Sequence, residues 1–146
     1  MDLHIRRMVP GDLEELFALL SDPCVMEHME APYTREQAKD FLETAGLTDP
    51  PRIYAAEDEG QFLGYVIFHP WDKESMELGW VLRREAWGRG YATMITKLAQ
   101  AKAREMEKDL IIECVPSQAV TGHIAEKCGF AFEGEIDDLL VYRWRP

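Results

Sequence analysis

The chain has 146 residues, of which 47% are hydrophobic, and a formal net charge of −11 at pH 7. This length suits one compact domain, and the apolar fraction is too high for a disordered chain. The acidic balance argues against bulk binding of nucleic acid or of anionic membranes, because both need a basic face. An anionic ligand would therefore have to be captured by a local basic site.

The sequence favours a cytoplasmic protein without a metal centre. Residues 1–7 lack the apolar core of a signal peptide, and no apolar stretch approaches the roughly 18 residues that span a bilayer. The cysteines, Cys24, Cys114 and Cys128, are far apart and form no CxxC motif. We therefore expect neither a disulfide framework nor a zinc site.

The N-terminal third predicts one strand followed by two helices. Residues 3–9 are strand-like, and the turn at residues 10–12 starts an amphipathic helix that ends before Pro23. A second helix is expected to begin at Thr34-Arg35-Glu36-Gln37, because this tetrapeptide has the form of a capping box, and to end at Gly46.

The rest of the chain mixes strands and helices in an order that differs from that of a doubly wound sheet. The expected strands cover residues 53–57, 62–69, 77–82, 110–115, 130–133 and 139–144. The expected helices cover residues 91–106, with Ile95, Leu98, Ala99 and Met106 on the inner side, and residues 117–127, with Gly129 as the C-terminal glycine. The pattern predicts one mixed α/β (α+β) domain over residues 1–146, with several antiparallel strand neighbours.

One segment combines a strand, a loop with two glycines and the start of a long helix. Gly88 and Gly90 let the loop curl, and a helix N-terminus presents unpaired backbone N–H groups and partial positive charge. Together these features can cradle a phosphate group. Residues 83–104 contain six basic side chains and one acidic one, a net charge of +5, which leaves −16 for the rest of the chain. The alternative interpretation is an ordinary turn beside a solvated basic surface.

The loop resembles the acyl-CoA pyrophosphate loop of the GNAT superfamily of N-acetyltransferases, over the residues Trp87-Gly88-Arg89-Gly90-Tyr91-Ala92-Thr93. Gly90 and Ala92 hold the last two places of the family pattern Gln/Arg-x-x-Gly-x-Gly/Ala. Trp87 stands at the first place, as in the ribosomal-protein N-terminal (RimJ/RimL-like) branch. Residues 116–130 resemble that branch's Pro-x-Asn-x-x-Ser … Glu-Lys-x-Gly-Phe, so the resemblance covers essentially the whole chain.

The resemblance implies a fold, a cofactor and a reaction. The fold is a central, mostly antiparallel mixed sheet, splayed between its fourth and fifth strands and flanked by about four helices. Acetyl-CoA (coenzyme A) would be the acyl donor, and a primary amine the acceptor, either a protein N-terminus or a small cationic amine. The amine would attack directly in a ternary complex. The alternative is a non-catalytic acyl-CoA-binding sensor or module on the same fold. Homodimers are common in the fold, and no feature of this sequence demands one.

The resemblance also assigns cofactor-binding residues. Backbone groups of Val81 and Leu82 would pair with the pantetheine amides as a false strand, and amides of the glycine loop would bind the pyrophosphate. Arg84 or Arg89 could meet the 3′-phosphate or stay in solvent. Trp80 could line the acceptor pocket. The full cofactor-binding set is Trp80, Val81, Leu82, Trp87, Gly88, Arg89, Gly90, Tyr91, Ala92, Thr93 and Gln118, the last at the place of the branch's Asn.

Transfer to an amine needs a base, an oxyanion donor and a group that stabilises the CoA thiolate. Glu77 is the candidate base, because it begins the acyl-binding strand where the superfamily often keeps a carboxylate; a solvated strand-end charge is the alternative. A backbone N–H near Val81 would be the oxyanion donor. Many family members use a Tyr as the acid where this chain has Ala125. Thr121, at the place of a Ser in the branch, is the candidate instead, with an ordinary helical Thr as the alternative.

Other polar residues give weaker indications. The acidic regions 27–59 and 133–138 would suit a cationic acceptor, although acidic surfaces also serve solubility. Asp137-Asp138 could attract such an acceptor or simply form a solvated turn. His28, His69 and His123 have no metal-like spacing and are expected to be surface or packing residues.

Overall fold

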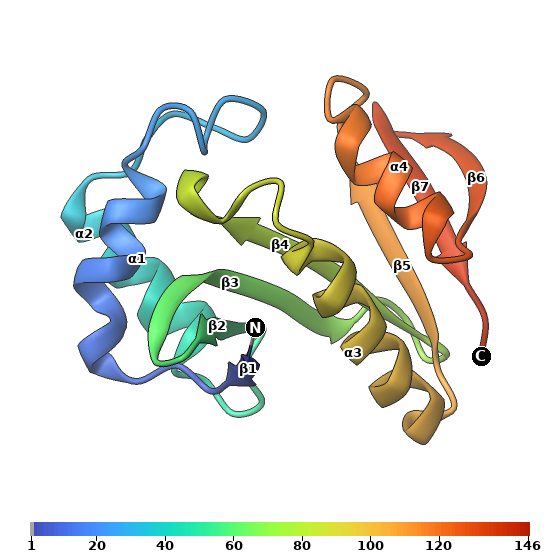
Figure 1. Cartoon of the computed structure of the whole chain (residues 1–146), viewed down its shortest axis with the longest axis horizontal. Coiled ribbons are helices and arrows are strands. Elements are labelled where there is room, and N and C mark those ends of the chain that lie inside the picture. Colours follow the sequence, from blue (N-terminus) through green and yellow to red (C-terminus); the bar gives the residue numbers. More distant parts are fainter. Residues whose placement is uncertain (1) are drawn as a thin grey trace. The chain divides into compact units, whose positions relative to one another are not determined.

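The computed structural model describes residues 2–146, in which seven strands and four α-helices follow one another along the chain (Figure 1). The strands are β1 (Leu3–Arg6), β2 (Ile53–Asp58), β3 (Gln61–Pro70), β4 (Ser75–Leu82), β5 (Asp109–Cys114), β6 (Ala131–Ile136) and β7 (Leu139–Trp144). The α-helices are α1 (Leu13–Leu20), α2 (Arg35–Phe41), α3 (Tyr91–Met106) and α4 (Ala119–Lys127).

The sheet is mixed and has the hydrogen-bonded strand order β1-β2-β3-β4-β5-β7-β6. β4 and β5 pair in parallel, whereas β1 with β2, β2 with β3, β5 with β7 and β6 with β7 pair antiparallel. The register of the parallel pair runs from Ser75–Asp109 to Glu77–Ile111, and β4 continues beyond it to Leu82. The predicted mixed α/β sheet is confirmed.

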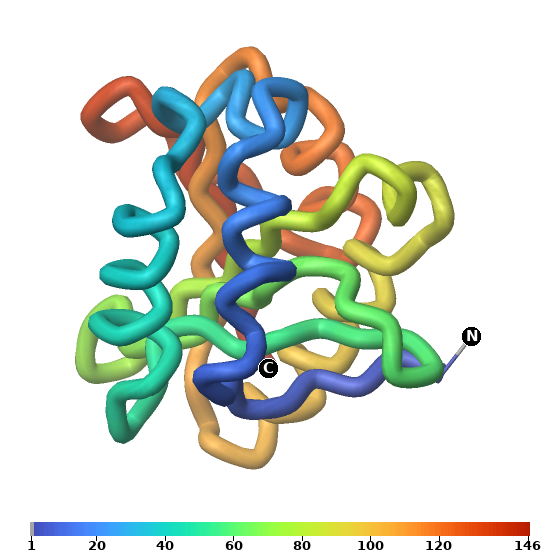
Figure 2. Tube along the Cα trace, turned by 90° about the vertical axis from the view of Figure 1, so that its left-hand side faces the viewer, coloured from blue at the N-terminus to red at the C-terminus, as the bar shows by residue number. Residues whose placement is uncertain are grey.

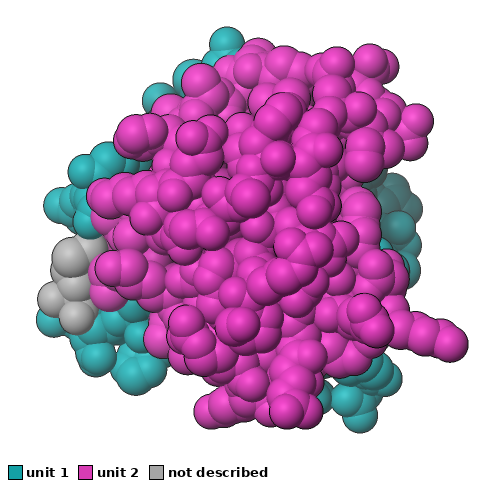
Figure 3. All heavy atoms as spheres, turned by 90° about the vertical axis from the view of Figure 1, so that its right-hand side faces the viewer, with its two compact units in different colours: residues 1–67, 80–89 teal, residues 68–79, 90–146 magenta. Residues whose placement is uncertain are grey.

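Contacts group the chain into two compact units, coloured separately in Figure 3. Unit 1 comprises residues 1–67 and 80–89, and unit 2 comprises residues 68–79 and 90–146. β3 and β4 each contribute residues to both units.

In unit 1, α1 and α2 contact one another and run side by side in Figure 2. The capping box predicted at the start of α2 is confirmed: the Thr34 Oγ1 accepts from the Gln37 N–H at 3.2 Å, and the Gln37 Oε1 accepts from the Thr34 N–H at 2.8 Å. A π-helical segment, Leu42–Gly46, continues α2 and ends at the glycine that the sequence indicated. The core beneath these helices includes Leu16, Leu20, Ala38, Leu42, Ala55 and Tyr65.

In unit 2, α3 contacts β5 and α4. Its buried side chains are Tyr91, Ile95, Thr96, Ala99, Gln100 and Ala103. The prediction for Leu98 was wrong, because this side chain is 48% exposed. At 100° per residue, the buried arc runs from Tyr91 through Ile95 to Gln100, and Leu98 falls just outside its Tyr91 edge. The polar Gln100 is accommodated in that arc because its amide donates to the Cys128 carbonyl at 2.8 Å.

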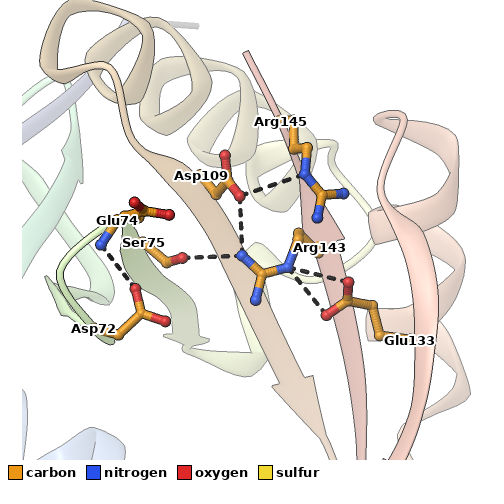
Figure 4. Close-up of polar contacts among 7 residues, drawn as sticks. All are labelled: Asp72, Glu74, Ser75, Asp109, Glu133, Arg143 and Arg145. Carbon is orange, nitrogen blue, oxygen red and sulfur yellow. Dashed lines mark hydrogen bonds and ion pairs between the residues drawn. The ribbon is translucent and has the colours of Figure 1, made fainter.

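A charged network fixes the start of β4 in unit 2 (Figure 4). The Arg143 Nη1 of β7 donates to the Ser75 Oγ at 3.0 Å and to the Asp109 Oδ2 at 2.9 Å, while its Nε donates to both carboxylate oxygens of Glu133 at 3.0 and 3.1 Å. Burial opposes the charge of Arg143, but the hydrogen bonds to Glu133 and Asp109 outweigh it and raise the pKa of the guanidinium. The Arg143 side chain of β7 thus contacts residues of β4, β5 and β6. Its contact on β4, Ser75, lies two residues before Glu77.

Candidate active site

The glycine loop enters α3 with both glycines in the left-handed backbone region. φ is +71° at Gly88 and +86° at Gly90, which is the N-cap residue of α3. Among residues 2–146, no side chain caps this N-terminus, and the first turn holds no acidic residue. A Cβ built on either glycine would meet no atom within 4 Å, so the space beside the loop is open. The start of α3 therefore offers backbone donors and partial positive charge to an anion.

Trp87 connects this loop to the end of β4. Its indole Nε1 donates to the Leu82 carbonyl at 2.8 Å, while the residue as a whole is 50% exposed. Val81 and Leu82 are buried, and Trp80 is half-buried. A Cβ on Gly64 of β3 would lie 2.0 Å from the Val81 carbonyl oxygen, so only glycine permits this close approach. The end of β4 is thereby held against β3, with its loop tied back onto it.

The arginines of the loop have different partners. The Arg84 Nε donates to the Asp22 Oδ2 at 2.7 Å, and this hydrogen bond lowers the pKa of the Asp22 carboxyl. The Arg83 Nε donates to the Glu85 Oε2 at 3.1 Å. Arg89 is exposed and forms no ion pair with any residue that the structure describes. Arg89 is therefore the loop arginine whose charge is available to a ligand.

The residues predicted in the second half of the chain come together at the start of α4. Gln118 is the N-cap residue and is half-buried; its carbonyl accepts from the Thr121 N–H at 3.1 Å. Thr121 is also half-buried. Ala125, at the place where the family resemblance implied a tyrosine, is fully buried.

Tyr142 of β7 was not predicted as a site residue from the sequence. It packs against Gly122 of α4, the residue after Thr121. A Cβ on Gly122 would lie 2.5 Å from the Tyr142 Oη, so the phenol occupies the space that a side chain there would need. Burial raises the pKa of Tyr142, and the nearby Cys114 and Glu126 raise it further. The sequence signal that could have indicated this contact was Gly122 inside the predicted helix. A glycine in a helix interior lowers helix stability, so its presence there indicates that a neighbouring group needs the space.

Glu77 does not stand alone, because its Oε1 lies 3.2 Å from the His69 Nε2. Their side chains are 22% and 16% exposed. The hairpin between β3 and β4, in which the Trp71 N–H donates to the Ser75 carbonyl at 2.8 Å, brings the two residues opposite each other. His69 was expected to be an isolated surface or packing residue, and the structure corrects this to a partner of the candidate base.

A second carboxyl group lies near this pair. Glu113 is two residues beyond Ile111, which pairs with Glu77, so both acids lie on one face of the sheet. Burial raises the pKa of Glu113, and the charges of Glu77 and Asp137 raise it further. Asp137 and Asp138 both have positive φ, 52° and 65°, and form the turn between β6 and β7.

Unit 1 contains an open groove of about 860 Å³ along α2 and the loop before it. The charged residues that line it are Glu30, Glu36, Asp40, Glu43 and Lys39. Four acids against one base give the groove a negative character, as expected for residues 27–59.

Within residues 2–146, no group of three or more His, Cys, Asp or Glu side chains is arranged to hold a metal ion. In the same part of the chain, no helix has the length and apolar character needed to cross a membrane.

Residues 2–131 match the family model of the acetyltransferase (GNAT) domain. The chain belongs to the GNAT acetyltransferase family. The match includes the glycine loop, both candidate catalytic residues and Gln118. A search of curated proteins finds no match for this GNAT chain.

Several solved structures share the fold of this chain. A GNAT-family acetyltransferase from Bacillus anthracis is 22% identical, with a TM-score of 0.88 over 99% of this chain and 95% of that one. RimL, a ribosomal L7/L12 alpha-N-protein acetyltransferase in complex with coenzyme A, is 15% identical, with a TM-score of 0.86 over 99% and 94%. Spermidine N-acetyltransferase from Vibrio cholerae, in complex with CoA and spermine, is 20% identical, with a TM-score of 0.79 over 97% and 93%. The GNAT fold predicted from the sequence is confirmed.

Proposed function

We propose that this GNAT domain transfers the acetyl group of acetyl-CoA to a primary amine, either a protein N-terminus or a small cationic amine, in a ternary complex. The observation that carries the proposal is the glycine loop, where two left-handed glycines lead into an uncapped helix N-terminus. This geometry suits a diphosphate. The similar structures that contain CoA, with spermine in one of them, support the choice of cofactor and acceptor class.

In this proposal the cofactor is held mainly by backbone groups. Amides over residues 88–93 bind the pyrophosphate, and backbone groups of Val81 and Leu82 pair with the pantetheine arm. Arg89 takes the 3′-phosphate, because Arg84 is already paired with Asp22. Trp87 acts indirectly by tying the loop to β4, while Trp80 and Gln118 complete the site.

Acetyl-CoA supplies a carbonyl that an amine can attack. Side chains of the protein must then accept and donate the protons that move during the transfer. Glu77 accepts the proton of the acceptor ammonium, which leaves the nitrogen lone pair free to form the new C–N bond. As the C–S bond breaks, the sulfur leaves with the bonding electron pair; the Thr121 hydroxyl passes its proton to this thiolate and takes the second proton of the attacking nitrogen, so that CoA leaves as the thiol. A backbone N–H near Val81 stabilises the oxyanion.

A cationic acceptor agrees with the charges of both units. In unit 1, four acids line the groove along α2. In unit 2, Glu113 is close enough to Glu77 and to Asp137 for their charges to interact. Each group of acids would attract an ammonium group and disfavour an acidic acceptor.

The test is a screen of polyamines, amino acids, aminoglycosides and peptides with free N-termini, each with acetyl-CoA. Release of CoA thiol is followed by a thiol reagent, and products are identified by mass spectrometry. We expect saturable transfer to a cationic amine and loss of turnover, with unchanged acetyl-CoA affinity, in Glu77→Gln. A protein that acetyl-CoA does not stabilise against heat would contradict the proposed function.

One observation favours a second candidate, a non-catalytic acyl-CoA sensor. Ala125 is fully buried where many family members place the tyrosine that protonates the thiolate. Thermal stabilisation by acetyl-CoA without thiol release for any amine in the screen would support the sensor. Multiple turnovers with any amine would exclude it.

A further inference from the structure

The contact between the His69 Nε2 and the Glu77 Oε1 is a hydrogen bond only if one of these two atoms carries a proton. The His69 Nδ1 lies 3.0 Å from the Pro70 carbonyl oxygen, which can only accept, so Nδ1 carries the hydrogen. A neutral imidazole has one N–H, so its Nε2 then directs a lone pair at the Glu77 Oε1, 3.2 Å away. An ionised carboxylate also only accepts. The two groups form a hydrogen bond only when the pair holds one additional proton.

The charged groups on the neighbouring strands are acidic or already paired. Glu113 of β5 lies on the same face of the sheet as Glu77, and Asp137 of the β6–β7 turn lies near Glu113. Arg143 of β7 pairs with Ile111, the β5 residue that pairs with Glu77. Arg143 is engaged by Asp109 and Glu133. With His69 16% exposed, its proton can still return to solvent.

We propose that His69 is a positioning residue that acts through Glu77 and takes the proton that Glu77 removes from the acceptor. This inference rests on the proposed amine acetylation. An N–H bond of the ammonium breaks as an O–H bond forms on Glu77. That O–H bond then breaks as an N–H bond forms at the His69 Nε2. The product is an imidazolium that donates to the Pro70 carbonyl and to Glu77, which is a carboxylate again.

The first test does not depend on activity. Protein labelled with ¹⁵N in its imidazoles is titrated by NMR, and the ring nitrogen that carries the proton in neutral His69 is identified from two-bond correlations. We expect the proton on Nδ1 in the wild type and in Glu77→Gln. A neutral His69 protonated on Nε2 would overturn the inference. This result is independent of whether any amine is acetylated, so it separates failure of the relay from failure of the proposed function.

The second test is kinetic and uses the best acceptor of the screen. His69→Asn should lower kcat about 10-fold or more, leave the KM for acetyl-CoA within about twofold, and change the pH profile of kcat. Free imidazole should restore part of kcat in His69→Gly, as a purely structural role would not predict. His123→Asn, on the exposed side of α4, is the matched control and should retain wild-type kinetics. Wild-type kcat in His69→Asn, or no rescue by imidazole in a folded His69→Gly, would refute the relay. If the variants do not fold, the NMR result on the wild type decides.

Discussion

Gly90→Asp tests the anion cradle at the start of α3, and Gly60→Asp is its matched control. The two glycines have nearly the same left-handed backbone, with φ of +86° and +79°, and a Cβ on either meets no atom within 4 Å. Gly60 lies in the turn between β2 and β3, away from the loop in sequence. Each variant should lose roughly 1 kcal/mol of stability from backbone strain, a fall in Tm of about 3–4 °C.

The two variants should differ in binding. Two unit charges about 5–6 Å apart repel by about 3 kcal/mol at an effective dielectric constant near 20, which corresponds to a loss of more than about 100-fold in affinity. An aspartate at residue 90 would stand beside the pyrophosphate at such a distance and also fill the open space beside the loop. Gly60→Asp adds the same charge to the chain at a turn that is not part of the cradle.

Calorimetric titration with CoA and with acetyl-CoA measures the effect, and circular dichroism shows whether each variant is folded. We expect no measurable binding by Gly90→Asp and a Kd within about twofold of wild type for Gly60→Asp. Unchanged affinity in folded Gly90→Asp would refute the cradle. An equal loss of affinity in both variants would attribute the effect to net charge or strain instead of to the site.

Three further variants test the structure around the site. Arg143→Met removes the central side chain of the unit 2 network and should lower the unfolding free energy, measured in urea, by about 2–3 kcal/mol. The control Arg145→Met, at an exposed side chain, should change the unfolding free energy by less than about 0.5 kcal/mol. Equal effects of the two variants would contradict the central role of Arg143. The fold raises the pKa of Glu113, so the ionised carboxylate destabilises the native state above that pKa. Glu113→Gln should therefore raise Tm near about pH 8. This gain in Tm should disappear near about pH 4, below the ordinary glutamate pKa of about 4.3. A gain that is the same at both pH values would refute this electrostatic origin. Gly122→Ala should lower the unfolding free energy by about 1–3 kcal/mol, because the added methyl group meets Tyr142, and by less in a Tyr142→Phe background. A double-mutant cycle that finds no coupling between the two positions would show that the phenol does not fill that space.

Local signals predicted the helices well. Residues 91–106 were expected to be helical and form α3 over that range, and the capping box starts α2 where the sequence placed it. A cap depends on a few consecutive residues, so its signal lies entirely in the local sequence. Strand ends were less accurate: β1 ends at Arg6 instead of at residue 9, because the partner strand decides where pairing stops. The misplaced Leu98 has a similar cause, since apolar character alone does not reveal which arc of a helix faces its neighbours.

The sequence by itself determined the family resemblance, the mixed sheet and the position of the glycine loop. These follow from consecutive residues: two glycines before an apolar-periodic helix, a local excess of basic residues, and alternating strand patterns. Only the tertiary structure decided that His69 faces Glu77, that Arg84 is occupied by Asp22, and that Tyr142 lies beneath Gly122. Each of these contacts joins residues that are 8 to 62 positions apart in the chain. Strand register and helix packing, which are cooperative properties of the whole fold, bring such residues together, so no local pattern encodes them.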